Sequence, residues 1–165
     1  GADAAAVGVS VGRAMDAGAA GINMEDRLPG ETALLPVAEA QARYRAAADT
    51  GIFVNARCDV FRGGDAAKDG DALVAATLER ARVYADAGAG SLFVPFLLDP
   101  KCIGAICQGS PLPVNILRGK GGPTHKELAA LGVARISHGH QPWAGAMAWL
   151  TGQAQQVLGG EEPDY

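Results

Sequence analysis

Polar side chains follow four short apolar runs, at the positions where buried strands would end. These segments read Asn23-Met24-Glu25-Asp26, Asn55-Ala56-Arg57-Cys58-Asp59, Pro113-Val114-Asn115 and Ser137-His138-Gly139-His140. A carboxylate such as that of Glu25 can support Mg²⁺ directly or through water. The guanidinium group of Arg57 matches a carboxylate or phosphonate, and neutral amides can orient further oxygens. These residue types predict a site for a small metal-bound anion, such as a 2-oxo acid.

The spacing of these residues predicts which of them face the site. Side chains alternate along a strand, so Asn23 lies on the same side as Glu25, and Asn55 on the same side as Arg57. By the same alternation Cys58 points away, into the core. Asp59 is a candidate for orienting Arg57, although a purely structural ion pair of Arg57 is an alternative.

The two histidines, His138 and His140, allow three interpretations. One of them contacts substrate or transfers a proton, both bind a metal, or both are ordinary loop residues.

Strands and helices are predicted to alternate along the whole chain. The helices have apolar residues at helical spacing, for example in the segments 4–17 and 142–157, and glycines or prolines at their ends. Short β-branched or apolar runs predict strands at 20–25, 52–57, 91–95, 113–117 and 133–137. Such alternation is typical of a parallel sheet with helical crossovers.

The predicted fold class is α/β, of the (β/α)8 TIM-barrel type. No glycine-rich phosphate loop follows any strand, which disfavours an open-sheet ligand-binding module. A full barrel takes about 250 residues, and this chain has 165 and begins without a strand. We therefore expect five βα units, strands four to eight, in a domain over residues 1–158, followed by a frayed tail over 159–165.

Composition narrows the function classes. The net charge is -4, and no basic cluster with interleaved aromatics is present, which argues against a nucleic-acid surface. No apolar run is long enough to cross a bilayer, and no leader resembles a signal peptide. Cys58, Cys102 and Cys107 lack C-x-x-C spacing, which favours free thiols. We expect a cytoplasmic enzyme that binds neither nucleic acid nor membrane.

Six motifs in order resemble the strand motifs of the isocitrate lyase/phosphoenolpyruvate mutase superfamily. They are Gly21-Ile-Asn-Met-Glu-Asp26, Val54-Asn-Ala-Arg-Cys-Asp59, Tyr84-Ala-Asp-Ala-Gly-Ala89, Phe93-Val-Pro95, Pro113-Val-Asn-Ile-Leu117 and Leu131-Gly-Val-Ala-Arg-Ile-Ser137. The resemblance implies a barrel with Mg²⁺ at its mouth and a tetramer that exchanges its last helix. It also implies that Glu25 supports the metal, that Arg57 holds the substrate and that Asn115 contacts a substrate carboxylate.

The chain departs from this pattern in two places. The principal metal-binding aspartates of the superfamily would precede residue 1. The loop 27–35 lacks the Lys-x-Cys-Gly-His motif of isocitrate lyases, so isocitrate cleavage is not expected.

We interpret the chain as a Mg²⁺-dependent lyase that cleaves a C–C or C–P bond of a small 2-oxo acid through an enolate. Arg57, Asn115 and His138 are the catalytic candidates, Asn55 and Ser137 are further substrate-binding candidates, and loop 27–35 is expected to close over the site. The alternatives are a phosphonopyruvate mutase or hydrolase and a non-catalytic fragment.

Overall fold

The fold is an alternation of helices and strands, seen in a computed structural model that describes residues 3–165. The elements are α1 (Ala4–Asp16), β1 (Gly21–Glu25), α2 (Val37–Ala48), β2 (Phe53–Arg57), α3 (Ala66–Asp86), β3 (Ser91–Val94), α4 (Pro100–Gly109), β4 (Val114–Leu117), α5 (His125–Ala130), β5 (Arg135–Ser137) and α6 (Gln141–Leu158). Each predicted strand is present, with bounds that differ by no more than two residues.

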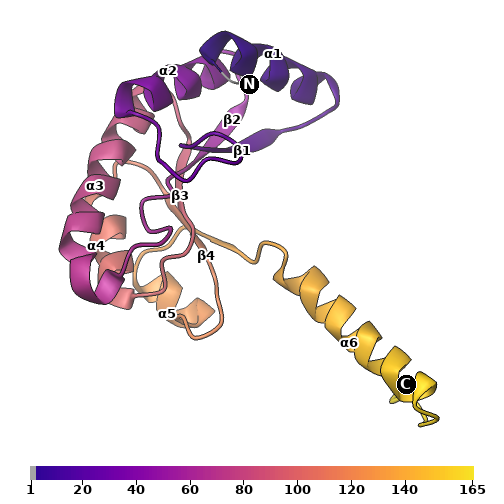
Figure 1. The fold of residues 1–165 in the computed structure, drawn as a ribbon. Helices are drawn as coiled ribbons and strands as arrows, with labels where there is room; N and C mark the ends of the chain where they lie inside the picture. The colour runs from indigo at the N-terminus through magenta and orange to yellow at the C-terminus, as the bar shows by residue number, and fades with distance from the viewer. Residues whose placement is uncertain (1–2) are drawn as a thin grey trace.

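The five strands form one parallel sheet in the order of the chain, from β1 to β5. The helices α1 to α5 curve around one side of this sheet, and its other side is concave (Figure 1). This is the arrangement of consecutive βα units in a TIM barrel. The prediction of five βα units of this fold class is therefore confirmed.

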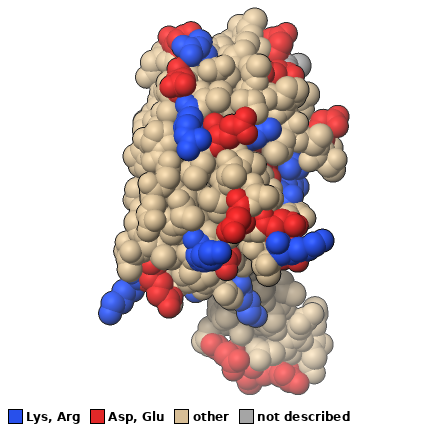
Figure 2. All heavy atoms as spheres, turned by 90° about the vertical axis from the view of Figure 1, so that its left-hand side faces the viewer, with Lys and Arg blue, Asp and Glu red and all other residues tan. Residues whose placement is uncertain are grey.

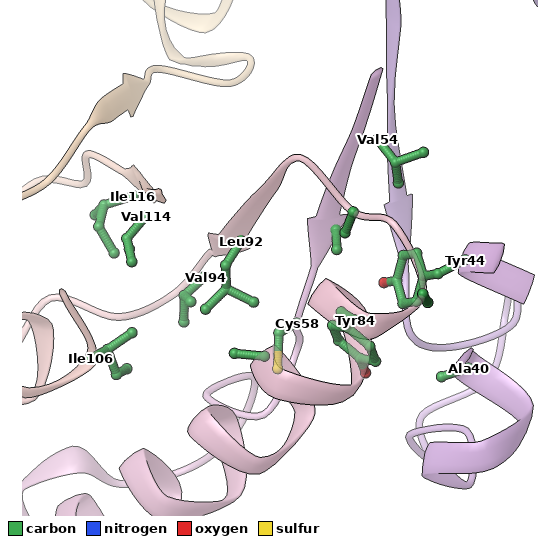
Figure 3. Packing of buried hydrophobic residues seen from close by; sticks show 14 of the residues in the cluster. Ala40, Tyr44, Val54, Cys58, Tyr84, Leu92, Val94, Ile106, Val114 and Ile116 are labelled. Carbon is green, nitrogen blue, oxygen red and sulfur yellow. The ribbon is translucent and has the colours of Figure 1, made fainter. Parts of the chain in front are cut away.

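The core lies between the sheet and the helices that cover it. Alternate strand residues such as Val54, Leu92 and Ile116 point toward the helices and are at most 1% exposed. They pack against helical side chains, of which Tyr44 and Tyr84 are the largest (Figure 3). The same alternation leaves the polar strand residues on the concave side, so the sheet itself positions the candidate site.

Glycine turns of one kind join three helices to the strands that follow them. Gly18, Gly88 and Gly132 have φ angles of 89°, 91° and 91°, a region that other residues rarely adopt. Each glycine ends its helix and reverses the chain into the next strand. These are the recurring Gly positions that the sequence places between helix and strand.

The last helix, α6, projects away from the rest of the molecule (Figure 1). Its apolar side chains include Trp143, Trp149 and Leu150, each more than half exposed. In the tail over 159–165, the Asp164 backbone N–H donates to Gln153 Oε1 of α6 at 2.6 Å. The Tyr165 ring also lies 6.2 Å from the Trp149 ring.

Charges of both signs are interspersed over the helical face of the molecule shown in Figure 2. Among the described residues, no helix combines the length and apolar character needed to cross a membrane. The three cysteines are free thiols, and Cys58 is fully buried in the core as its position in the strand motif predicts.

The substitution Gly88→Ala should destabilise the fold. Its methyl group would meet the Ala48 Cβ at 2.8 Å, and φ would stay in the left-handed region. Such strain costs about 1–3 kcal/mol, so the urea midpoint should fall. Gly12→Ala is the control, because nothing lies within 4 Å of its Cβ position in α1; it should leave the midpoint unchanged or raise it. Equal midpoints for the two variants would contradict the prediction.

Candidate active site

The concave side of the sheet carries two hollows. One, about 600 Å³, lies toward the start of the strands and is lined by Asn23, Asn55 and Ser91 among others. The second, also about 600 Å³, lies at the strand ends and is lined by Arg57, Phe96 and His138 among others. Because barrel enzymes assemble their sites at the strand ends, the second hollow is the candidate active site, here called the mouth hollow.

Arg57 is held in a fixed orientation at the end of β2. Its Nε and Nη2 donate to the two carboxylate oxygens of Asp59 at 2.6 and 2.8 Å. Nη2 also lies 3.0 Å from Glu25 Oε2. The hydrogen bonds to Asp59 raise the pKa of Arg57 above its ordinary value, although partial burial opposes this. Within residues 3–165, Nη1 makes no hydrogen bond, so it is the nitrogen available to a ligand.

Asp59 is the shared counter-ion of three arginines. Its carboxylate is fully buried and lies 3.4 Å from Arg27 Nε and 3.6 Å from Arg62 Nη1, in addition to the bonds from Arg57. Arg27 belongs to loop 27–35, which the sequence analysis expects to close over the site. The ion pairs therefore connect that loop to the substrate-binding candidate Arg57.

A second buried carboxylate, that of Asp26, holds the backbone of Asp59 in place. Asp26 Oδ1 accepts from the Asp59 backbone N–H at 2.9 Å, and Asp26 Oδ2 accepts from the Tyr84 hydroxyl at 2.7 Å. Arg80 lies 3.3 Å from Asp26 and donates to the Leu35 carbonyl at 2.9 Å. The neighbouring Asp26 charge adds to burial in raising the pKa of Tyr84, so its hydroxyl stays protonated and keeps donating.

Asn55 lies one layer below Arg57 and is 3% exposed. Its amide nitrogen donates to Asn23 Oδ1 at 2.6 Å, and its Oδ1 accepts from the Ser91 hydroxyl at 2.6 Å. Both ends of the Asn55 amide are therefore engaged within the sheet. Asn55 and Arg57 thus line different hollows, and Asn23 lines both.

Asn115 on β4 has a donor without an acceptor. The residue is fully buried, and its Oδ1 accepts from the Ser137 hydroxyl at 3.1 Å. Its Nδ2 is buried and has no hydrogen-bond partner among residues 3–165. A buried unpaired donor costs about 1–3 kcal/mol, so an acceptor atom of a ligand at this position would relieve that penalty.

His138 follows β5 and lines the mouth hollow together with His140. Its ring meets the His125 ring edge to face, with centroids 5.1 Å apart. The structure therefore brings Arg57, Ser137 and His138 to one hollow and places Asn115 behind Ser137. Asn55 lies apart from this group, in the layer below.

The described residues do not by themselves form a magnesium site. No group of three or more His, Cys, Asp or Glu residues among them could hold a metal ion. Asp26 and Asp59 are buried against arginines, and Glu25, whose side chain is 33% exposed, is itself paired with Arg57. Glu25 is thus the one carboxylate among the candidate residues that could contribute to a metal site.

Three features of the site were not predicted from the sequence. Arg135 lies on the concave side, level with Asn115, and lines both hollows. Asp26, Arg80 and Tyr84 form the buried network described above. Phe96 lines the mouth hollow, and its backbone has a left-handed conformation. The alternation of β5, with Ile136 packed on the core, could have revealed Arg135.

Phe96 is the one residue other than glycine with a positive φ, at 67°, in the described part of the chain. Its ring centroid lies 5.7 Å from the guanidinium carbon of Arg57 and 5.5 Å from that of Arg62. The strain costs about 1–3 kcal/mol, and exposed cation–π contacts return about 0.5–1 kcal/mol each. Together the two contacts are comparable in size to the strain.

The alternation of helices with a parallel five-stranded sheet places the chain in the TIM-barrel class of α/β folds. Comparison with known proteins identifies the family. The model of the phosphoenolpyruvate phosphomutase family matches residues 1–158, and the chain belongs to this family. It lies within the phosphoenolpyruvate mutase/isocitrate lyase superfamily, as the six motifs indicate.

The relatives agree with this assignment. A crystal structure of a candidate phosphonomutase from Burkholderia cenocepacia J2315 is 44% identical, with a TM-score of 0.90 over 95% of this chain and 65% of that one. An uncharacterized protein of Mycobacterium tuberculosis (strain ATCC 25618 / H37Rv) is 35% identical over 87% of this chain and 53% of its own length. A 2,3-dimethylmalate lyase structure, 20% identical with a TM-score of 0.77 over 94% of this chain and 56% of its own, shows the same fold. The chain thus spans about half of its curated relative's length.

The substitution Asp59→Asn should lower stability, because it removes the charge that three arginines share. Breaking a buried ion pair costs about 3–5 kcal/mol, and the partial exposure of Arg57 places the expected loss near the lower value. Urea denaturation measures it. Asp71→Asn is the control, since Asp71 pairs with Lys101 at 3.3 Å on an exposed surface and should have little effect. Similar midpoints for the two variants would refute the role of Asp59.

Proposed function

We propose that the protein is a Mg²⁺-dependent lyase that cleaves a C–C or C–P bond of a small 2-oxo acid through an enolate. The observation that carries the proposal is a pair of donors without a hydrogen-bond partner among residues 3–165: Arg57 Nη1 in the mouth hollow, and Asn115 Nδ2, which is buried next to Ser137 at the edge of that hollow. The superfamily includes lyases, mutases and hydrolases that act on 2-oxo acids. A cytoplasmic location remains our expectation for such an enzyme.

Arg57 and Asn115 would hold the anion and the developing enolate oxygen. Asp59 engages one edge of the Arg57 guanidinium group, so the group is oriented before substrate arrives. Donors fixed in advance toward developing negative charge stabilise a transition state more than donors that must first reorganise. Ser137 orients Asn115 through the hydrogen bond to Oδ1.

His138 would deliver or remove the proton at the carbon that the bond cleavage leaves behind. It shares the mouth hollow with Arg57 and is exposed enough to exchange its proton with water. An imidazole is suited to this role near neutral pH.

Magnesium enters the proposal through the family, whose superfamily members generally depend on it. When bound, Mg²⁺ would polarise the oxygens of the 2-oxo acid. Of the described residues, Glu25 is placed to support it through water, which would require Glu25 to turn from Arg57. That movement would also free the second N–H of Arg57 Nη2 for the substrate.

The substitution Arg57→Lys should reduce kcat/KM for oxaloacetate. Losing a hydrogen bond to a charged group costs about 1.5–3 kcal/mol, which corresponds to roughly 10- to 150-fold. The assay follows pyruvate formation by the full-length gene product with and without Mg²⁺. Arg62→Lys is the control, because Arg62 contacts the same Asp59 from a half-exposed position, and its effect should be small.

The same assay separates the alternatives. Phosphate release from phosphonopyruvate, without pyruvate from oxaloacetate, would identify a hydrolase. Equal activities of wild type and Arg57→Lys would exclude Arg57 as the substrate-binding residue. The absence of any Mg²⁺-dependent turnover would contradict the proposed function.

We further propose that α6 mediates assembly into a tetramer by exchange between subunits. Trp143, Met147, Leu150 and Val157 share one face of α6 and are each 38–65% exposed. An apolar face of this kind on a projecting helix is typical of an interface.

The substitution Leu150→Glu should therefore lower the molar mass measured by light scattering coupled to size exclusion. Gln155→Glu lies on another face of the same helix and should leave the mass unchanged. A wild-type protein with the mass of one subunit would refute the tetramer.

A further inference from the structure

Phe96 forms the most exposed part of an apolar wall in the mouth hollow. This wall consists of Phe93, Pro95, Phe96 and Leu117, which come from β3, β4 and the turn after β3. Phe93 and Pro95 are buried, whereas Phe96 is 49% exposed. Polar residues, among them Arg57 and Ser137, line the rest of the same hollow. A ligand in the hollow therefore meets an anion-binding part and an apolar part.

The contacts of Arg57 determine how a ligand approaches it. Asp59 occupies the edge formed by Nε and Nη2, and the Phe96 ring lies 5.7 Å from the guanidinium carbon. The remaining nitrogen, Nη1, is open among the described residues. An anion bound at Nη1 would therefore be close enough to the Phe96 ring for the carbon atoms attached to that anion to contact it.

The conformation of Phe96 indicates that the ring has a role beyond packing. A left-handed backbone is one that glycine or asparagine adopts more readily than phenylalanine. Its ring is nevertheless half exposed rather than buried in the core. Strained residues of this kind occur at ligand-binding positions.

We propose that Phe96 is a specificity-determining residue that makes the mouth hollow favour 2-oxo acids carrying an alkyl group. The proposal rests on Arg57 as the anion-binding residue of the proposed function. The carboxylate binds at Arg57, and the alkyl chain packs on the exposed Phe96 ring and the wall behind it. Substrates without such a chain leave the ring in contact with water.

The test uses a series of ligands that differ by one methylene: pyruvate, 2-oxobutanoate and 2-oxopentanoate, with oxalate as an anion that has no alkyl group. Isothermal titration calorimetry on the full-length gene product gives their Kd values. One buried methylene corresponds to up to about a four-fold change in Kd. Affinity of the wild type should rise along the series.

The substitution Phe96→Asn should remove this rise and leave the Kd of oxalate nearly unchanged, because asparagine tolerates the left-handed backbone but has no ring. Phe96→Tyr is the matched control, since it keeps the ring and should keep the rise. Urea midpoints of both variants report whether they are folded.

Three results would overturn this proposal alone. The affinity of the wild type could fail to rise from pyruvate to 2-oxopentanoate. Alternatively, the affinity of Phe96→Asn could rise along the series as much as that of the wild type. Phe96→Asn could also weaken oxalate as much as 2-oxopentanoate, which would make the ring a structural support of Arg57. Failure of the proposed function gives a different pattern: Arg57→Lys would leave oxalate binding intact, whatever Phe96 does. Absence of binding by all four ligands would overturn both.

Discussion

Two buried carboxylates determine how the strand ends are organised. Asp26 and Asp59 are both at most 1% exposed, and each is paired with arginine. A buried charge without a partner costs several kcal/mol, so these arginines cannot leave without penalty. Arg57 is therefore held where a substrate can use it, and loop 27–35 is held through Arg27 and Leu35. The site depends on this ion network more than on any single catalytic candidate.

The network also connects elements that are distant in the sequence. Asp26 ends β1, Asp59 follows β2, and Arg80 and Tyr84 belong to α3. The helix that covers the sheet thus contributes directly to the orientation of the strand ends. A substitution on the buried face of α3 would therefore alter the orientation of Arg57 through Asp26 and Asp59, although it changes no residue that lines the mouth hollow.

The sequence was sufficient to predict the strands, the glycine turns and the side of each strand that carries polar residues. These features depend on neighbours two to four residues apart, and local patterns record them. The burial of Asp26 could not be predicted in this way, because Arg80 and Tyr84 lie 54 and 58 residues further along the chain. The same limit applies to Phe96, because the two arginines that contact its ring, Arg57 and Arg62, lie at the end of another strand. The sequence motif did suggest that Asp59 orients Arg57, and the hydrogen bonds between them agree with it, but it did not indicate that Arg27 and Arg62 share the same carboxylate.

The ion network has an electrostatic consequence at longer range. Four guanidinium groups, those of Arg27, Arg57, Arg62 and Arg80, share three carboxylates, those of Glu25, Asp26 and Asp59. The strand ends therefore carry a local excess of positive charge on a chain whose net charge is -4. Such an excess in a concave region concentrates field lines and draws anions from solution toward it, an effect that salt screens. The acidic character of the whole chain has the opposite effect on anions elsewhere on the surface, so the electrostatic potential at the strand ends differs in sign from the average over the chain.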